Sequence, residues 1–262
     1  MPDVNLLAIR KRVNAANQTR KITHTMELIA SSRLQQSKAQ LAHHQVWLQH
    51  MREAAGCLAD RYFEPLEQRW ARRQNAYIVF GGSKGLSGSY SPSLLQYADA
   101  AAAGHPVVAV GSAAEAFYPD AHSLLGDEPP SADYAQTIAH AALTLYESRE
   151  VDAVYLIYTK GSRHMKEPLL PLTRVRAEQN VGVVVEPSAR RLYPALYRAY
   201  VQAIVHEAHL QAFLAEQIAR VSAMNNATEN ADKIVEGLQA AYNRIRQAAI
   251  TQEILIVSNA AR

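Results

Sequence analysis

A glycine-rich stretch is the pattern in this sequence most suggestive of phosphate chemistry. Gly81–Ser89 reads GGSKGLSGS and follows a short apolar run. Backbone amides in such a loop can form a nest that binds an anion. The P-loop pattern, however, requires a glycine directly before the lysine and a hydroxyl residue after it, whereas Lys84 is followed by Gly85. We therefore favour a tight strand-to-helix connection over a nucleotide site.

The histidines and the cysteine show no spacing typical of a metal or catalytic site. His206 and His209 are three residues apart and share a helix face, but no third ligand stands at a matching distance in the ten-histidine sequence. Cys57, the only cysteine, has no evident histidine partner and is interpreted as an inert thiol. The sequence thus predicts no catalytic residue, no metal site and no bound cofactor.

Charge is distributed unevenly along the chain. The net charge is +3, yet residues 1–52 carry eight basic side chains against two acidic ones, Asp3 and Glu27. This bias favours an acidic partner about as well as it favours a solvated helix face, and it is too weak to indicate nucleic acid. No apolar run is long enough to span a membrane, and the N-terminus has no secretion-signal or transit-peptide pattern.

Proline and glycine divide the chain into three parts. Residues 3–55 contain neither, and residues 195–262 contain only Gly237. Stretches free of both residues are typical of long helices, here roughly 80 and 100 Å long at about 1.5 Å per residue. We expect an N-terminal helical segment over 1–70, an α/β domain over 71–194 and a C-terminal helical segment over 195–262.

A heptad seam runs along the C-terminal segment. Its members alternate steps of three and four: Val221, Met224, Thr228, Ala231, Val235, Leu238, Tyr242, Ile245 and Ala249. The N-terminal segment shows Leu6, Ile9, Val13 and Ala16, and then a slipped series of Ile22, Met26 and Ile29. Such seams predict an antiparallel coiled coil between the two ends of the chain. Two separate helices on a bundle core are the alternative.

Between the helical segments, strands and helices alternate. Strands are expected at 76–80, 106–110 and 152–159, and helices at 92–103 and 131–147, with further strands at 169–176 and 181–185. This order indicates βαβ units. The predicted fold class is therefore α/β: a long antiparallel coiled coil of the terminal helices with an inserted Rossmann-like domain.

Several segments resemble the gamma subunits of F-type ATP synthases. The run 242–254, YNRIRQAAITQEI, is similar to the family pattern YNxxRQAxITQEI almost letter for letter, and 224–231, MNNATENA, is similar to AMxxATxNA. Residues 9–30 resemble the N-terminal family pattern, 84–88 resemble RGLCGG, and 167–172 match EPLLPL. The segments occur in family order. The single Cys57 excludes the paired-cysteine redox switch of the chloroplast branch.

The resemblance implies a central rotor shaft without a catalytic site of its own. Its implied partners are the α and β subunits of the catalytic ring, the epsilon subunit and the membrane c-ring, with no nucleic acid and no directly bound nucleotide. It implies a peripheral location on the cytoplasmic face of the bacterial inner membrane. Ion flow turns the shaft, and the shaft changes the conformation of the β subunits.

The resemblance also assigns partner contacts. The residues expected to touch the β subunits, as catch and shaft, are Met26, Arg220, Arg246, Gln247, Thr251 and Glu253. The expected apolar pivot is Ile254, Leu255, Ile256 and Val257. Met26 is further expected to pack close to the catalytic ring and to Arg220 or its neighbours on the C-terminal helix. Alternatives are a gamma subunit of a divergent second Na⁺- or H⁺-translocating ATPase and an unrelated coiled-coil scaffold.

Overall fold

The computed structural model describes residues 2–62, 74–83, 85–124, 129–172, 186 and 188–260. Five helices lie in these ranges: α1 (Pro2–Tyr62), α2 (Tyr90–Ala102), α3 (Ser112–Phe117), α4 (Ala132–Glu147) and α5 (Ala189–Ala260). Five strands lie among them: β1 (Asn75–Phe80), β2 (Val107–Val110), β3 (His122–Leu124), β4 (Ala153–Lys160) and β5 (Arg163–Leu170). The chain divides into a terminal unit, residues 1–31 with 220–262, and a central unit, residues 32–219.

The two predicted long helices are present. α1 has 61 residues and α5 has 72. α5 begins at Ala189, before the predicted residue 195, and contains Pro194 in its second turn. Proline lacks the N–H for one helical hydrogen bond and is tolerated best near a helix start. The domain limits at 70/71 and 194/195 stay a prediction.

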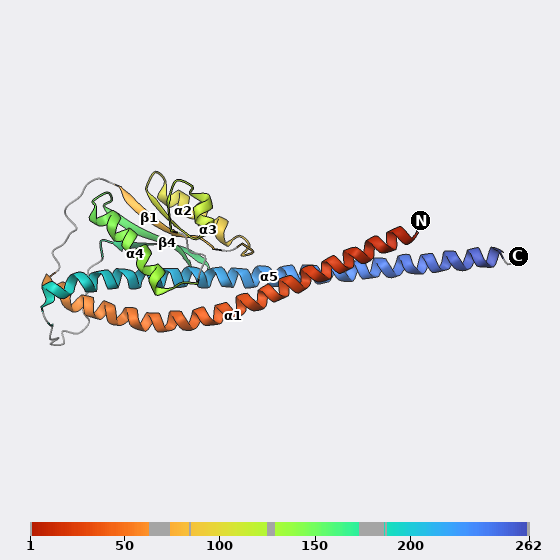
Figure 1. Cartoon of the computed structure of the whole chain (residues 1–262), viewed down its shortest axis with the longest axis horizontal. Coiled ribbons are helices and arrows are strands. Elements are labelled where there is room, and N and C mark those ends of the chain that lie inside the picture. Colours follow the sequence, from red (N-terminus) through yellow and green to blue (C-terminus); the bar gives the residue numbers. More distant parts are fainter. Residues whose placement is uncertain are drawn as a thin grey trace. The chain divides into compact units, whose positions relative to one another are not determined.

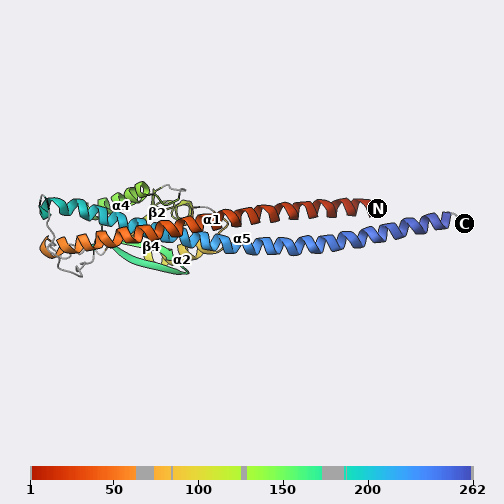
Figure 2. The same ribbon diagram turned by 90° about the horizontal axis from the view of Figure 1, so that it is seen from below.

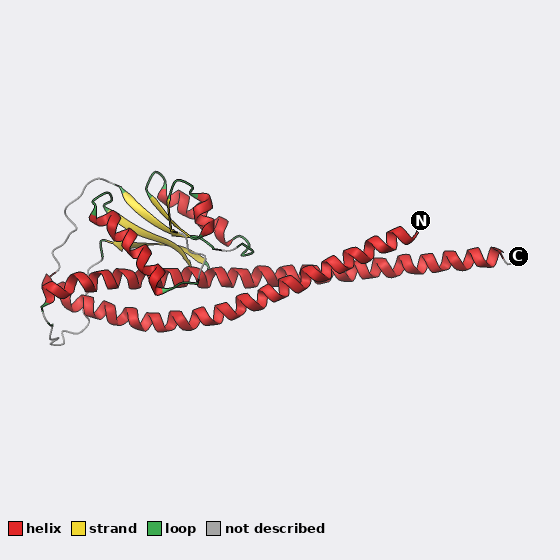
Figure 3. Ribbon diagram, viewed as in Figure 1, coloured by secondary structure: helices red, strands yellow, loops and turns green. Residues whose placement is uncertain are grey.

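A single mostly parallel sheet organises the central unit (Figure 3). Its strand order is β3-β2-β1-β4-β5; the first four strands are parallel, and β5 pairs antiparallel with β4. The strand order reverses at β1: the chain first adds β2 and β3 on one side of β1, and then β4 and β5 on the other side. This is the topology of a doubly wound Rossmann-like fold, and it confirms the predicted fold class.

Alternate residues of each strand face opposite sides of the sheet, and helices cover both sides (Figure 1). Ile78 and Phe80 belong to a core with α4 and with the parts of α1 and α5 in this unit. Tyr77 and Val79 belong to a second core with α2. The continuous apolar character of β1 follows from this burial on both faces.

The predicted strands at 76–80, 106–110 and 152–159 correspond to β1, β2 and β4, and the predicted helices correspond to α2 and α4. The interpretation of 169–176 as a strand is wrong in its start, because β5 begins at Arg163 and ends at Leu170. Residues 173–185, including the expected strand 181–185, lie outside the described residues. The short elements α3 and β3 were not predicted.

Within the central unit, α1 and α5 lie side by side and run in opposite directions (Figure 2). The His44 ring nitrogen Nε2 lies 2.7 Å from the carbonyl oxygen of Ala203, and the Gln45 amide donates to Glu207 at 3.4 Å. Leu48 and Met51 continue the same face of α1 and are buried in the core. The predicted antiparallel pairing therefore holds in this unit.

Candidate functional site: the paired helices of the terminal unit

Two polar contacts set the register of the helices in the terminal unit. Arg20 Nε lies 3.2 Å from an Asp232 carboxylate oxygen, and the Thr228 hydroxyl donates to the Thr23 hydroxyl at 2.8 Å. Thr23 is three residues later than Arg20 on α1, whereas Thr228 is four residues earlier than Asp232 on α5. The helices of this unit are therefore antiparallel, as the seams predicted.

The predicted seam of α5 is the face that packs against α1. Met224, Ala231 and Val235 are buried, and the other members are half-buried: Val221, Thr228, Leu238, Tyr242, Ile245 and Ala249. Residues on the opposite face, including Ile234, are exposed. Small seam residues such as Ala231 allow the helix axes to approach closely.

The predicted slip in the α1 seam is wrong. Ile22 is 59% exposed, Met26 38% and Ile29 44%. Their neighbours Thr23 and Glu27 are half-buried, and Ala30 is buried. The seam therefore keeps its heptad register from Ala16 to Thr23, seven residues later, and continues by steps of four and three to Glu27 and Ala30. Two polar residues occupy the seam, and the larger apolar ones point away from α5.

This inversion leaves an apolar stripe on the outer face of α1. Ile22, Met26 and Ile29 recur at helical spacing and share one face. Leu28, next to it, is also exposed. An apolar stripe on a helix that already has a partner on its other face is typical of a protein contact surface.

The C-terminal run of α5 also presents its side chains outward. Arg246, Gln247 and Thr251 are exposed, and the Thr251 hydroxyl donates to the Gln247 carbonyl oxygen at 2.9 Å. The side chain of Glu253 lies outside the described set. The hydrogen bond restricts the Thr251 rotamer.

The expected pivot residues are exposed where they are described. Ile254, Leu255 and Val257 all leave more than half of their surface in solvent, and the Ile256 side chain lies outside the described residues. Because Ile254 and Val257 are three residues apart and Leu255 adjoins them, the apolar groups surround much of the helix. A seam directed at one partner helix would be narrower.

The structure separates Met26 from Arg220 along the helix pair. Arg220 is 7% exposed, whereas Met26 is partly open to solvent. Continuing the register set by Thr23 and Thr228, Met26 lies level with Met224 and Asn225. Arg220 lies more than a turn further along α5. The register therefore places Met26 nearer to Met224 than to Arg220, but its exposed side chain lies on the outer stripe, and its expected packing stays a prediction.

In the central unit, the glycine-rich loop lies at the carboxyl end of β1, where the strand order reverses. This crevice is the usual ligand position in a doubly wound sheet. Here α5 places Glu216 against the loop: its carboxylate accepts a weak hydrogen bond from the Ser83 N–H at 3.5 Å. A Cβ on Gly82 would lie 3.5 Å from the same carboxylate. The loop amide thus faces an anion supplied by the chain itself.

Little space remains at this crevice. The cavity lined by Gly81, Gly111, His209 and Glu216, among others, has a volume of about 10 Å³, which accommodates about one water molecule. The loops after β1 and β2 approach each other closely, since Gly81 N–H donates to the Val110 carbonyl oxygen at 2.8 Å. The glycines therefore serve this close approach, which agrees with the interpretation as a tight connection.

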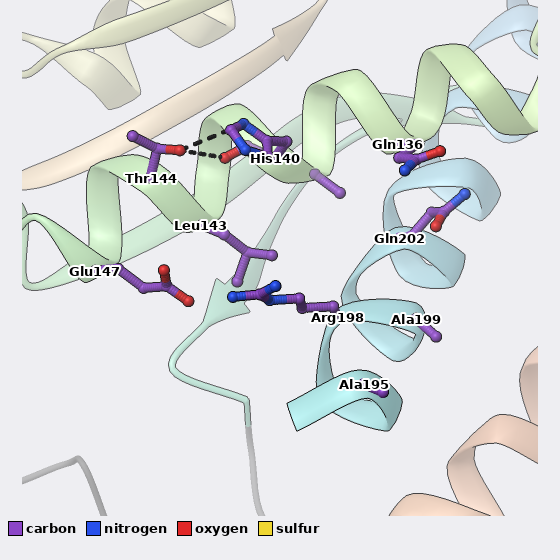
Figure 4. Close-up of a pocket in the computed structure, with 10 residues that line it drawn as sticks. Gln136, His140, Leu143, Thr144, Glu147, Ala195, Arg198, Ala199 and Gln202 are labelled. Atoms are coloured by element: carbon purple, nitrogen blue, oxygen red, sulfur yellow. Dashed lines mark hydrogen bonds between the residues drawn. The ribbon is translucent and has the colours of Figure 1, made fainter. Parts of the chain in front are cut away.

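A larger groove lies between α4 and the first turns of α5 (Figure 4). Its volume is about 450 Å³. Ala139, Leu143 and Ala199 form an apolar floor, and polar side chains line its rim: Gln136, His140, Thr144, Glu147, Arg198 and Gln202. Figure 4 shows the Arg198 guanidinium reaching across the groove toward Leu143 and Glu147. An apolar floor with a polar rim is the anatomy of a protein contact.

In the described ranges, no group of three or more histidine, cysteine, aspartate or glutamate side chains could hold a metal ion. Nor does any described helix combine the length and apolar character needed to cross a membrane. The candidate sites are therefore the exposed faces of the helix pair and the α4–α5 groove, which are surfaces suited to proteins.

Comparison with known proteins identifies the family of this chain. The family model described as ATP synthase matches residues 5–262. A gamma chain of ATP synthase from Ruminiclostridium cellulolyticum is 31% identical, with 95% of each chain covered. This chain belongs to the ATP synthase gamma-chain family. The gamma chain of Exiguobacterium sibiricum is also 31% identical, over 98% of both chains.

Solved structures show the same fold as this gamma-chain family member. A rotor chain of the Euglena gracilis mitochondrial ATP synthase aligns with a TM-score of 0.65 at 15% identity, covering 95% of this chain and 99% of that chain. A central-stalk chain of the Tetrahymena thermophila enzyme aligns with a TM-score of 0.60 at 20% identity, covering 79% and 99%. The paired helices and the inserted sheet are thus the family architecture.

Proposed function

We propose that this chain is the central rotor shaft of an F-type ATP synthase and couples rotation of a membrane ring to ATP synthesis or hydrolysis at the β subunits. It contributes no catalytic residues and binds no cofactor in this role. Rotation changes which β subunit meets which face of the helix pair, and differential contact with β conformations couples the two processes. No observation favours an unrelated scaffold.

The observation that carries this proposal is the double-sided use of the terminal helices. One face of each helix packs against the other helix, and the opposite faces expose large apolar and polar side chains. On α1 these are Ile22, Met26 and Ile29, and on α5 they include Gln247 and Leu255. A paired helix that retains such surfaces is suited to turning inside a ring of other subunits.

Co-expression with the α and β subunits of the same genome tests the proposal. Size-exclusion chromatography with subunit quantification should give one copy of this chain for three α and three β subunits, together with ATPase activity. A chain that never enters the ring, although α and β assemble with another gamma chain, would refute the shaft role.

We further propose that Arg246, Gln247, Thr251 and Glu253 form the contact at which the β subunits catch the shaft. The exposed Gln247 and Thr251 side chains support this. Replacing both with alanine should lower the ATPase rate of the assembled complex and its coupled synthesis about thirtyfold, because two hydrogen bonds of about 1 kcal/mol each are lost. Steady-state ATP hydrolysis and synthesis in reconstituted vesicles measure this.

The matched control is Gln239→Ala, which removes an exposed glutamine from the same helix two turns earlier. It should assemble and hydrolyse ATP at the wild-type rate. Equal rates in the wild type and the Gln247→Ala/Thr251→Ala complex would refute the catch. A loss of assembly in both variants would assign the effect to helix structure instead.

The outer stripe and the apolar end complete the proposed contact with the ring. Met26, with Ile22 and Ile29, would face the β subunits from α1, and the buried Arg220 would support the pair from within. Ile254, Leu255, Ile256 and Val257 would turn as an apolar pivot in a sleeve formed by the ring. Their exposure in the isolated chain supports a partner that covers them.

We also propose that the α4–α5 groove receives the epsilon subunit, while the central unit grips the c-ring. Filling the groove should weaken epsilon binding: His140→Trp should raise the Kd at least about tenfold, since a steric bulge in an interface costs about 1.4 kcal/mol or more. Titration of the assembled catalytic complex with labelled epsilon measures this Kd.

Thr137→Trp is the control for the groove, because Thr137 is exposed on α4 but does not line the groove. An unchanged Kd in both variants would place epsilon elsewhere on the chain.

The same partners imply a peripheral position at the cytoplasmic face of a bacterial inner membrane, which the bacterial origin of the similar gamma chains supports.

A further inference from the structure

Three histidines cluster where α1, α4 and α5 meet inside the central unit. The rings of His44 on α1 and His206 on α5 lie 4.5 Å apart, with 30° between their planes. One turn further along α5, the His209 ring lies 5.5 Å from the Phe80 ring and 5.4 Å from the Tyr134 ring. The described residues around this cluster are mainly those of the apolar core.

The hydrogen bonds of His44 and His206 run to backbone atoms, and the Ser131 bond favours a protonated His206 but offsets burial only in part. His44 Nε2 lies 2.7 Å from the Ala203 carbonyl oxygen, which can only accept, so this nitrogen carries the proton. His206 bonds the backbone of Ser131 at the start of α4. His209 is buried, and its Nδ1 has no hydrogen-bond partner within the described structure. A proton on that nitrogen would be a buried charge without a partner.

Burial lowers the pKa of His206 to about 4, with a smaller contribution from the neighbouring His44 ring. Burial likewise lowers the pKa of His209 to about 3, and His206 adds to the effect. In both cases the packed state disfavours the imidazolium, whereas an opened state would titrate near pH 6.5.

Two carboxylates border this junction, Glu207 beside His206 in the sequence and Glu216 in the same small cavity as His209, and two tyrosines lie near them. Glu207 of α5 accepts from Gln45 of α1, and Glu216 accepts from the Ser83 N–H. Tyr134 of α4 donates to the Leu124 carbonyl oxygen at 2.6 Å. On the sheet side, Tyr158 of β4 donates to Glu167 of β5 at 2.9 Å.

From this packing we propose that the histidine cluster is an acid-sensitive joint: protonation of His206 and His209 separates α1 from α5 and α4 in the central unit while the sheet stays folded. A cation on either ring of this tilted pair would lose its hydration in mainly apolar surroundings, and the backbone contacts at Ala203 and Ser131 offset only part of that cost. The proposed joint is a property of the central unit, and it does not depend on the proposed rotor function.

The direction of the effect follows from linkage. A histidine whose pKa is lowered on packing stabilises the packed state fully above pH 6.5, and that stability is lost as pH falls toward the lowered value. Between pH 7.5 and pH 5, His206 alone should raise the opening equilibrium roughly tenfold, allowing for its partial exposure.

Hydrogen exchange of the full chain at pH 7.5 and pH 5.0, expressed as protection factors, tests the joint. Peptides covering 41–51 of α1 and 199–210 of α5 should lose protection roughly tenfold at the lower pH. Peptides covering α2, on the other face of the sheet, should keep theirs. Equal loss in α2 would show that the unit unfolds as a whole and would overturn the proposal.

His206→Phe keeps an aromatic ring beside His44 but cannot take up a proton, so most of the pH response should disappear. His43→Phe is the matched control, because His43 is the exposed neighbour of His44 on α1; it should keep the wild-type response. If His206→Phe does not fold, His209→Phe makes the same comparison, because His209 is the second group whose protonation the proposal invokes. An undiminished response in the phenylalanine variant of either cluster position refutes the joint.

Discussion

Replacing Val235 with lysine will open the helix pair of the terminal unit, whereas the same change at the adjacent Ile234 will not. Val235 is 6% exposed on the α5 seam, and Ile234 is 56% exposed on the opposite face. The register places Val235 level with the half-buried Ala16 of α1. A lysine there loses the apolar contact and buries an ammonium, which costs about 2–4 kcal/mol.

Limited proteolysis of the isolated full chain measures this effect, because cleavage of a helix requires local opening. The cleavage rate within 220–260 should rise at least about tenfold in Val235→Lys, since 1.4 kcal/mol corresponds to a factor of ten. Ile234→Lys should be cleaved at the wild-type rate apart from any new site at the lysine, which a protease specific for aromatic residues avoids. Equal cleavage rates in Val235→Lys and the wild type would mean that pairing with α1 does not protect α5 from local opening.

Gly111→Ala will destabilise the central unit far more than Gly104→Ala. Gly111 has φ of 91° and ψ of 150°, a region that only glycine occupies readily. Its Cβ would lie 2.8 Å from the Gly81 carbonyl oxygen, where the loops after β1 and β2 meet. Backbone strain and this clash together should cost about 3 kcal/mol or more.

Gly104 is the internal control because its φ is also positive, at 77°, but a Cβ there would meet nothing within 4 Å. Gly104→Ala should cost about 1 kcal/mol, from backbone conformation alone. Urea unfolding of the full chain, followed by tyrosine fluorescence, gives both values. Similar losses at the two positions would show that the close approach of the two loops does not stabilise the sheet.

The seam of α5 could be predicted from sequence because its apolar residues face a helix of the same chain. The seam of α1 could not, at 22–29, because the apolar residues there face outward and Thr23 and Glu27 face α5. A periodicity argument assigns large apolar residues to the nearest partner, and it fails where the sequence encodes two surfaces on one helix. Here the failure coincides with the exposed apolar stripe of α1, the surface for which we propose a contact with the β subunits.

β5 was largely missed for a similar reason. Lys166, Glu167 and Pro168 precede the predicted strand 169–176, yet they lie in an edge strand paired with β4. Lys166 extends over the Tyr77 and Tyr155 rings, with its Nζ 4.8 and 4.7 Å from their centroids, so its stem packs while its charge contacts the rings. Proline is tolerated at a sheet edge. These stabilising contacts depend on residues far apart in the chain.

The candidate site was predicted through resemblance rather than through chemistry. Gln247 and Thr251 have no unusual spacing or charge, and their exposure alone does not distinguish them from other polar helix residues. The α4–α5 groove has no sequence signal, since its floor consists of alanines and a leucine from two distant segments. A surface that contacts another subunit combines residues from distant segments of the chain, so local sequence patterns do not predict it.

The antiparallel pairing has a consequence for synthesis. Thr23 and its partner Thr228 are 205 residues apart in the chain, so α1 leaves the ribosome long before its partner exists. At about 5–20 residues per second, it waits roughly 10–40 s. During that time its seam and its outer stripe are both uncovered, and closing so long a loop is costly until the sheet has folded. The nascent N-terminal helix is thus the segment of this chain that most needs a chaperone.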